Sequence, residues 1–296
     1  MSDIIRASHP RWELLRAASR LLSTALSWGS MLGRRAFEPL YILVYRVYAW
    51  HLASDVLKRP LPEHMAMILD GNRRFARSQG LSDPTEGYRY GASKVGEVIG
   101  WCDELSIPVV TLWGLSTDNL ERSQEELSAL FESLGDQLEE LGRYTAGRPG
   151  GRRIQIVGRR ELLPDQLRRQ IDDVERLTAS WGPGILNVAI AYGGRDEILD
   201  AVRRLLRTQG AAGDSVSDIA DTLSTETLHP YLYAPDMPEP DLIIRTSGEV
   251  RLSGFLLWQS VYSELYFCDA PWPAFRQIDF LRGIRSYQVR RRRSGR

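Results

Sequence analysis

The chain has 296 residues, of which 43% are hydrophobic and 26% are charged, as in an ordinary soluble globular protein. Its 38 basic and 38 acidic side chains cancel, and this balance argues against nucleic acid as a partner. Two cysteines without CxxC spacing and four histidines without an HxxxH or HExxH pattern indicate no disulfide framework, zinc site or histidine triad. This cysteine usage fits a reducing, cytoplasmic location best.

Residues 1–60 differ from the rest of the chain and predict an N-terminal helical extension. Leucines and tryptophans alternate with arginines over residues 12–32, a pattern typical of an amphipathic helix. The apolar run at 40–50 contains Arg46 and is too short to span a bilayer, and no signal peptide is evident. We favour packing of this extension on the main domain or on a partner subunit. The alternative is peripheral membrane contact through residues 1–60.

Strands and helices alternate over residues 61–296, which predicts one α/β domain with a central, largely parallel sheet flanked by helices. The predicted strands are 65–70, 108–115, 153–158, 185–192, 241–246 and 264–268. The predicted helices are 73–80, 88–105, 123–144, 164–181, 195–209 and 275–291. Because the carboxyl ends of parallel strands lie at one edge of a sheet, we expect the polar segments that follow these strands to converge.

The first strand ends at Asp70-Gly71-Asn72. A carboxylate at this edge would supply an oxygen ligand for a hard cation such as Mg2+. A glycine allows the backbone to approach a ligand closely, and the helix start that follows offers free N–H groups to an anion. The same helix adds the guanidiniums of Arg73, Arg74 and Arg77. The segment therefore predicts a magnesium-diphosphate site, and the alternative is an ordinary strand, turn and solvated helix.

A hydroxyl, an amide and a guanidinium follow the second strand at Ser116, Asn119 and Arg122. Ser123 and Glu126 have the spacing of a capping box, which predicts a helix that begins there. Helix capping alone does not explain the three residues before it. We expect those three side chains to lie beside the anion site.

Two later segments also have the composition of anion-binding loops. Arg245 and Arg251 flank a loop of hydroxyls and glycines that continues to Ser253, and this is the strongest anion signal in the chain. The glycines of Tyr192-Gly193-Gly194-Arg195 could form an anion nest, although a GG turn alone is weak evidence. The alternative for the segment from Arg245 to Ser253 is a surface loop with two solvated arginines. Glu264 is either a second carboxylate for a cation or an ordinary strand-edge glutamate.

These segments, in this order, resemble those of the cis-prenyltransferase family, which includes the undecaprenyl diphosphate synthases. The matching pieces are His64-x-Ala66-x-Ile68-x-Asp70-Gly71-Asn72-x-Arg74, Ser116-Thr117-x-Asn119-x-x-Arg122, Tyr192-Gly193-Gly194-Arg195, Asp241-Leu242-x-Ile244-Arg245-Thr246-Ser247-Gly248-Glu249-x-Arg251-x-Ser253-x-Phe255-Leu256-Leu257-Trp258-Gln259 and Tyr262-x-Glu264. The resemblance covers roughly residues 60–295. It implies an undecaprenyl diphosphate synthase-like catalytic domain over 61–296 that condenses isopentenyl diphosphate with an allylic diphosphate to form a Z double bond. It also implies a Mg2+-dependent homodimer.

The resemblance also implies roles for individual residues. The catalytic candidates are Asp70, Asn72, Ser116 and Asn119. The substrate-binding candidates are Gly71, Arg73, Arg74, Phe75, Arg77, Arg122, Glu126, Arg245, Arg251, Ser253, Arg293 and Gly295. Arg245, Arg251 and Ser253 match the isopentenyl diphosphate clamp, and Gly71, Asn72 and Arg74 match the allylic diphosphate cradle. Asp70 and Glu264 match the metal carboxylates, and Glu264 is expected to reach the site of the neighbouring subunit.

Several positions depart from the long-chain members of the family. Tyr88 stands where a histidine is usual, and Phe75 and Leu120 replace tryptophans. Here the chain resembles the short-chain actinobacterial branch that makes Z,E-farnesyl diphosphate. The small Gly114 speaks instead for a longer product. The candidates for a side chain that stops the growing tail are Trp101, Trp113 and Leu115.

Three alternative functions stay open at this point. The first is a medium- or long-chain polyprenyl diphosphate synthase. The second is a catalytically silent partner subunit of the same fold, which the retained Asp70 and Arg245 disfavour. The third is a generic nucleotide-binding protein, for which neither a GxxxxGK[ST] motif nor a GxGxxG motif after a strand is present.

Overall fold

The computed structural model describes residues 31–83, 85–146 and 151–291. The chain divides into two compact units, Met1–Asp55 and Val56–Arg296. Helix α2 (Met31–Val56) makes up the described part of the first unit. Most of the helix predicted at 12–32 lies outside the described residues, and the boundary at residue 60 stays a prediction. Within the described ranges, no helix is both long and apolar enough to cross a bilayer.

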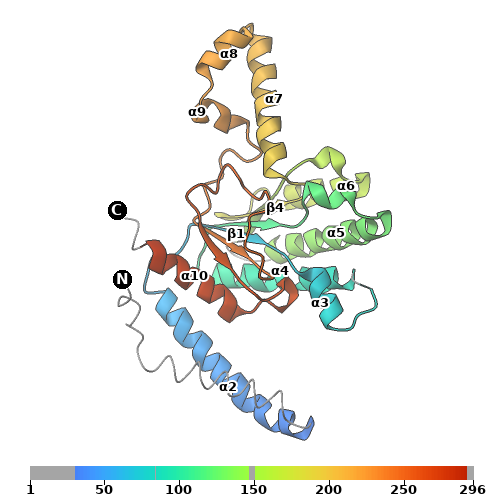
Figure 1. Ribbon diagram of the computed structural model, residues 1–296, viewed down its shortest axis with the longest axis vertical. Coiled ribbons are helices and arrows are strands. Elements are labelled where there is room, and N and C mark those ends of the chain that lie inside the picture. The colour runs from blue at the N-terminus through green and yellow to red at the C-terminus, as the bar shows by residue number, and fades with distance from the viewer. Residues whose placement is uncertain (1–30, 84, 147–150, 292–296) are drawn as a thin grey trace. The chain divides into compact units, whose positions relative to one another are not determined.

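The second unit is built on a six-stranded sheet with the order β3-β4-β2-β1-β5-β6 and parallel pairing throughout (Figure 1). The strands are β1 (His64–Ile68), β2 (Val109–Trp113), β3 (Arg152–Val157), β4 (Gly184–Ala189), β5 (Leu242–Arg245) and β6 (Glu264–Phe267). Continuous apolar runs such as the first two are typical of strands buried on both faces of a parallel sheet. The predicted α/β fold and all six predicted strands are confirmed.

The helices of this unit are α3 (Asn72–Ser78), α4 (Glu86–Glu104), α5 (Gln124–Ala146), α6 (Asp165–Thr178), α7 (Gly194–Ala212), α8 (Val216–Thr222), α9 (Thr225–Leu228) and α10 (Gln277–Arg291). Short 3-10 turns are η1 (Thr117–Glu121), η2 (Arg160–Leu162), η3 (His229–Tyr231) and η4 (Trp272–Ala274). All six predicted helices are confirmed. Helices α8 and α9 were not predicted, although Ser215 and Ser224 begin them with capping boxes.

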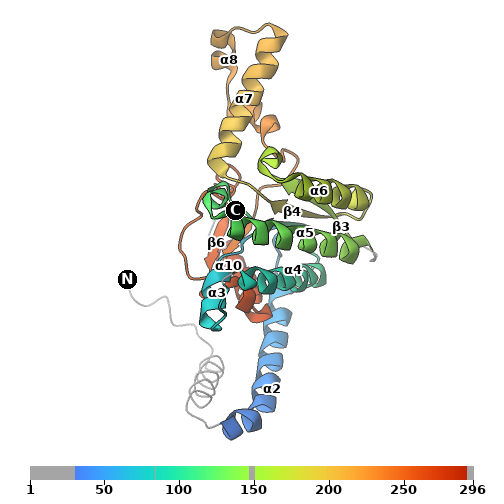
Figure 2. The same cartoon turned by 90° about the vertical axis from the view of Figure 1, so that its right-hand side faces the viewer.

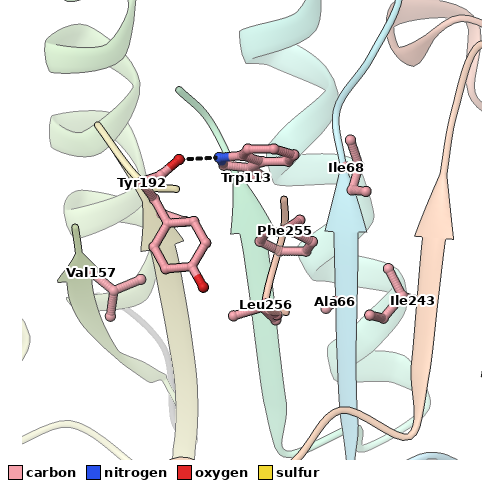
Figure 3. Packing of buried hydrophobic residues seen from close by; sticks show 9 residues of the cluster. Ala66, Ile68, Trp113, Val157, Tyr192, Ile243, Phe255 and Leu256 are labelled. Atoms are coloured by element: carbon pink, nitrogen blue, oxygen red, sulfur yellow. Dashed lines mark hydrogen bonds between the residues drawn. The ribbon is translucent and has the colours of Figure 1, made fainter. Parts of the chain in front are cut away.

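Helices α4, α5 and α6 lie side by side, and α10 contacts β5 and β6 (Figure 2). The opposite face of the sheet packs on the chain that follows β5, where Phe255 and Leu256 are fully buried. Figure 3 shows these two side chains against Ala66, Trp113 and Ile243 of the strands. The ring of Trp113 stacks on Phe255, with 5.0 Å between the centroids and 9° between the planes.

Strand register decides which side chains can face the helices. Met67 pairs with Leu112, and Leu112 pairs with Val188, so these three side chains share one face. The next residues along β1 and β2, Ile68 and Trp113, belong to the buried cluster on the other face. Any ligand that binds between the sheet and α4 or α5 therefore contacts the side chains of Leu112 and Val188.

A chain of buried hydrogen bonds crosses the sheet at His64. Its Nδ1 donates to the Pro238 carbonyl at 2.7 Å, and its Nε2 lies 2.8 Å from the Thr111 hydroxyl, which also accepts from Asn187 Nδ2 at 3.1 Å. The His64 side chain is fully buried. The neutral imidazole satisfies both of its nitrogens here, whereas an added proton would place a charge in the core.

Burial lowers the pKa of His64 from 6.5 to about 4. A lowered pKa in the folded state stabilises the fold above pH 6.5, and this contribution is lost as the pH falls through the folded pKa. We expect the free energy of unfolding to fall by about 2–3 kcal/mol between about pH 7 and about pH 4.5 on account of this residue. Urea unfolding of the wild type and of His64→Gln measures it. Equal pH dependence of the two proteins would contradict the prediction.

Candidate functional site

A cavity of about 550 Å³ opens at the carboxyl edge of the sheet and continues between β1, β2 and β4 and helices α4 and α5. Polar side chains line one part of it, and these include most of the predicted site residues: Asp70, Asn72, Arg73, Arg74, Arg77, Ser116, Asn119, Arg122, Arg245, Arg251 and Ser253. The segments that follow β1, β2 and β5 supply nearly all of them. The predicted convergence at one edge is therefore what the fold produces.

Gly71 makes the turn that presents Asp70. Its φ is 101°, in the left-handed region that side chains rarely adopt. A Cβ at this position would lie 2.6 Å from the Ser247 hydroxyl and 2.8 Å from Pro271 Cβ. The Asp70 backbone is fixed on both sides, since its N–H donates to the Thr246 hydroxyl at 2.9 Å and its carbonyl accepts from Trp272 N–H at 2.9 Å. Only glycine fits this turn without displacing the neighbouring loops.

Arg245 and Asp70 form the centre of the polar part. Nη2 of Arg245 donates to Asp70 Oδ2 at 2.8 Å, while Nη1 donates to the Ser253 hydroxyl at 2.7 Å and to the Arg251 carbonyl at 2.5 Å. Arg245 is only 5% exposed, and its Nε has no hydrogen-bond partner among the described residues. Because a buried guanidinium needs its acceptors, Arg245 positions Asp70 and the Arg251–Ser253 loop.

Glu249 neutralises two of the arginines expected to bind diphosphate. Its Oε2 lies 2.6 Å from Arg251 Nη1, and its Oε1 lies 3.3 Å from Arg74 Nη1. Arg74 also donates to the Ser247 carbonyl at 2.9 Å and lies 3.4 Å from Asp70 Oδ1. A diphosphate that binds Arg74 and Arg251 therefore competes with Glu249. This role of Glu249 was not predicted from the sequence.

Ser116 and Asn119 bond to each other. The Ser116 hydroxyl accepts from Asn119 N–H at 3.2 Å, and Asn119 Oδ1 accepts from Ser116 N–H at 3.4 Å, which forms the capping box of η1. The box predicted at Ser123 is only half formed. Glu126 N–H donates to the Ser123 hydroxyl at 3.3 Å, but the Glu126 carboxylate bonds elsewhere because two stronger donors stand within reach.

Those donors are Arg122 and Tyr88. Arg122 Nη1 lies 3.0 Å from Glu126 Oε1 and donates to the Tyr88 hydroxyl at 2.6 Å, and that hydroxyl donates to Glu126 Oε1 at 2.6 Å. Burial and the hydrogen bond to Glu126 raise the pKa of Tyr88 to about 12, so the phenol stays protonated as a donor. Arg73 Nη1 lies 3.5 Å from the same carboxylate. Tyr88 lines the cavity and was not among the predicted site residues, although this position differs from the family pattern.

Asn72 is held against helix α4. Its Nδ2 donates to the Leu69 carbonyl at 3.2 Å, and its Oδ1 is buried without a hydrogen-bond partner in the described part of the chain. A Cβ on Gly91 would come within 2.2 Å of that oxygen, although such a contact falls on the end of a side chain. Asn72 and Gly91 both line the cavity, so the unused amide oxygen lies in its wall.

Not every predicted residue reaches this cavity. Phe75 packs on Tyr90 with 5.6 Å between the ring centroids. Glu264 begins β6 in register with Leu242, whereas Asp70 follows the other end of β1. Glu264 therefore lies at the amino end of its strand, away from Asp70 of the same chain, and its expected role at the site of a neighbouring subunit stays a prediction. Its Oε2 lies 3.2 Å from Arg290 Nη1. Arg293 and Gly295 lie outside the described residues.

The polar part of the cavity offers few protein ligands for a metal ion. No group of three or more histidine, cysteine, aspartate or glutamate side chains is placed to hold a metal within the described ranges. Asp70 offers one carboxylate, whose side chain is 29% exposed. Mg2+ is often held by one or two carboxylates and completes its shell with water and substrate phosphate oxygens. The donor set therefore fits a magnesium ion that shares its coordination with a diphosphate.

The part of the cavity along α5 is mainly apolar, although Ser133 and Gln137 also line it. Its lining residues include Val95, Leu112, Leu115, Leu130, Leu134, Leu138, Leu141 and Val188. The leucines of α5 recur at helical spacing, so they form one continuous face. Trp101 is absent from the lining among the described residues, and it packs instead on Phe280, with 5.6 Å between the centroids. Of the three candidates for a tail stop, Trp113 and Leu115 line the cavity, whereas the described lining does not include Trp101.

Comparison with known proteins gives the family. A sequence profile described as "Putative undecaprenyl diphosphate synthase" matches residues 68–295. The chain belongs to this family. The predicted resemblance is therefore confirmed, and the cavity at the carboxyl edge lies within the matched residues.

Individual members of the undecaprenyl diphosphate synthase family are similar over most of their length. A (2Z,6E)-farnesyl diphosphate synthase from Thermobifida fusca is 49% identical over 86% of this chain and 98% of that protein. A tritrans,polycis-undecaprenyl-diphosphate synthase (geranylgeranyl-diphosphate specific) from Methanopyrus kandleri is 47% identical over 86% of this chain and 92% of that protein. Lavandulyl diphosphate synthase from Lavandula x intermedia, solved in complex with dimethylallyl diphosphate, has a TM-score of 0.72 and 30% identity over 77% of this chain and 95% of that chain.

Proposed function

We propose that the protein is a cis-prenyltransferase that condenses isopentenyl diphosphate with an allylic diphosphate and forms a Z double bond. One observation carries this proposal. A single cavity joins a cluster of guanidiniums around Asp70 to a deep apolar channel along α5. An isoprenyl diphosphate has the same two parts, an anionic head and a hydrocarbon tail. The intact pairing of Asp70 with Arg245 speaks against a catalytically silent subunit.

The reaction breaks the C1–O bond of the allylic diphosphate, forms a bond from C4 of isopentenyl diphosphate to that C1, and releases a proton from C2. Negative charge accumulates on the departing diphosphate, so nearby cations lower the barrier. Arg74 beside Asp70 stabilises that charge, while Arg251 and Ser253 bind isopentenyl diphosphate. Magnesium, when bound at Asp70, supplies further positive charge to the leaving group. The side chain of Asn72 and the Ser116–Asn119 pair line the cavity where they can orient the substrates.

Three finer properties belong to the same proposal. The enzyme depends on Mg2+, for which the Asp70 carboxylate in the cavity wall, beside Arg74 and Arg245, is the proposed protein ligand. It acts as a homodimer, in which Glu264 serves the site of the neighbouring subunit. It resides in the cytoplasm, which the buried free thiols of Cys102 and Cys268 support, with peripheral membrane contact through residues 1–60 as the open alternative to packing on protein.

The test is an incubation of the purified protein with labelled isopentenyl diphosphate and, in separate reactions, dimethylallyl, geranyl or farnesyl diphosphate. We expect label to enter a longer isoprenyl diphosphate with at least one primer. Chelation of divalent cations by EDTA should stop incorporation, and added Mg2+ should restore it. The proposal fails if no primer is extended by a protein that is folded by circular dichroism.

We propose a short product, Z,E-farnesyl diphosphate. Tyr88 at the cavity and Leu120 support this choice, as does the similarity to the Thermobifida fusca enzyme of that name. The Methanopyrus kandleri relative carries a long-chain name at nearly the same identity, so overall similarity does not decide the length. The shape of the apolar channel must decide it, because a tail stops growing where a side chain blocks it.

Leu141→Ala is expected to lengthen the products. Leu141 is the lining residue of α5 farthest from the helix start near Arg122, and it is 2% exposed. Removing its side chain extends the channel at that end. Trp101→Ala is the matched control, because it also truncates a large packed side chain but does so outside the cavity. Chromatography of the products by chain length measures the effect. Identical products from wild type and Leu141→Ala would exclude Leu141 as the stop.

A further inference from the structure

A second cavity, of about 510 Å³, lies beyond the carboxyl end of β3, beside α7. It shares no lining residue with the cavity described above. Five arginines line it, namely Arg159, Arg160, Arg203, Arg204 and Arg207. The only carboxylates in its described lining are Asp200 and Glu161. In a chain whose net charge is zero, this is a local concentration of positive charge.

Asp200 is already saturated with donors. Arg159 bonds it in bidentate fashion at 2.9 and 3.0 Å, Arg203 Nη1 donates at 2.8 Å, and the Tyr233 hydroxyl donates at 2.7 Å. The hydrogen bonds from Arg159, Tyr233 and Arg203 hold the pKa of Asp200 well below its usual range. Asp200 therefore holds the guanidiniums of Arg159 and Arg203 in place and has few lone pairs left to accept hydrogen bonds from a third arginine.

The remaining arginines differ in their partners. Arg160 is held by Glu175, with Nη1 to Oε2 at 2.9 Å. The Arg204 guanidinium lies 5.1 Å from the centroid of the Tyr233 ring, and its Nε donates only to the Asp200 carbonyl, at 3.3 Å. Arg207 has no hydrogen-bond or ion-pair partner among the described residues. Arg204 and Arg207 are thus the two cations of the cleft that no carboxylate neutralises.

Helix geometry brings these two cations together. Residues 200, 203, 204 and 207 recur at three- and four-residue spacing, so they lie on one face of α7. Contact with Tyr233 restricts Arg204 to one side of the cleft. On α6, by comparison, Arg168 forms an ion pair with Asp165 of the same helix. On this face of α7, the carboxylate of Asp200 already accepts hydrogen bonds from Arg159 and Arg203.

We propose that this cleft is a second anion site, which binds a phosphoryl group of an inorganic or organic phosphate through Arg204 and Arg207, with Arg203 at its edge. Guanidiniums present paired N–H donors that match phosphate oxygens. The lining offers charged and polar groups rather than an apolar channel, so the anionic head alone is recognised. The site does not depend on the proposed prenyltransferase activity.

Equilibrium dialysis with labelled inorganic diphosphate, at low ionic strength and without divalent cations, tests the proposal on the full chain. We expect two sites per chain in the wild type and loss of one of them, or at least about a tenfold weaker second site, in Arg204→Gln/Arg207→Gln. The matched control is Arg168→Gln/Arg169→Gln on α6, which removes the same charge from two arginines that are likewise exposed but do not line this cavity, and it should keep both sites. Circular dichroism verifies that each variant is folded.

A second arm of the experiment identifies the ligand part that is recognised. Unlabelled inorganic diphosphate and isopentenyl diphosphate should compete equally at the site that requires Arg204 and Arg207. The proposal is overturned if Arg204→Gln/Arg207→Gln binds as many diphosphates, with the same affinities, as the wild type. It is also overturned if the α6 control loses the same site, because general charge would then explain the binding. If the protein were not a prenyltransferase, the wild type would still bind diphosphate at the site that requires Arg204 and Arg207, and Arg204→Gln/Arg207→Gln would still lose that site.

Discussion

Replacing Asp70 by alanine is expected to lower turnover at least about a hundredfold, the loss typical of removing one group that acts on charge in the transition state. The Asp70 carboxylate stands between Arg245 and Arg74, at 2.8 and 3.4 Å, in the mouth of the cavity. Without this carboxylate, the magnesium ion that is proposed to neutralise the leaving diphosphate loses its protein ligand. Steady-state rates with saturating primer, isopentenyl diphosphate and Mg2+ measure the loss.

Alanine at position 70 also affects stability. It leaves the buried Arg245 guanidinium without its carboxylate, and an unpaired buried charge destabilises a fold. Asp70→Asn is the control, because it keeps the shape and one hydrogen-bond acceptor while it removes the negative charge. We expect the Asn variant to retain more of the free energy of unfolding than the Ala variant, yet to lose turnover similarly. Wild-type turnover in Asp70→Asn at saturating Mg2+ would contradict the role of the carboxylate.

Arg251→Ala is expected to raise the Michaelis constant for isopentenyl diphosphate by about 10- to 150-fold, which corresponds to about 1.5–3 kcal/mol for hydrogen bonds to a charged group. The Arg251 side chain is 63% exposed and pairs only with Glu249, so its removal costs the fold little. The paired variant is Arg74→Ala, which should act on the allylic primer instead. Initial rates with each substrate varied in turn separate the two effects. A change confined to the primer constant in Arg251→Ala would reverse the assignment of the two subsites.

The fold could be predicted because the residue patterns of the individual strands and helices agree with the order in which strands and helices alternate along the chain. Apolar runs such as those of β1 and β2 are typical of strands buried on both faces, and alternation with helices favours parallel pairing. The gathering of Asp70, Ser116 and Arg245 follows from the same topology, since each comes after the carboxyl end of a strand or ends one. The site could therefore be located in the sequence before any side-chain contact was known.

The choice of partners within the site could not be predicted. Glu249 bridges Arg74 and Arg251, and Glu126 turns from its capping position to Arg122, because tertiary structure decides which of several acceptors lies in reach. Alternation along β2 stacks the Trp113 ring on Phe255, on the sheet face opposite Leu112, although Trp113 still lines the cavity at the carboxyl edge.

The proposed reaction at the carboxyl edge of the sheet is a Z-selective condensation. The most direct measurement is the configuration of the new double bond after incubation of the purified protein with Mg2+, geranyl diphosphate and isotopically labelled isopentenyl diphosphate, read by NMR of the dephosphorylated product. We expect the first added unit to be Z, with no product formed by Asp70→Asn. An E double bond, or equal product from the Asp70→Asn variant, would contradict the account.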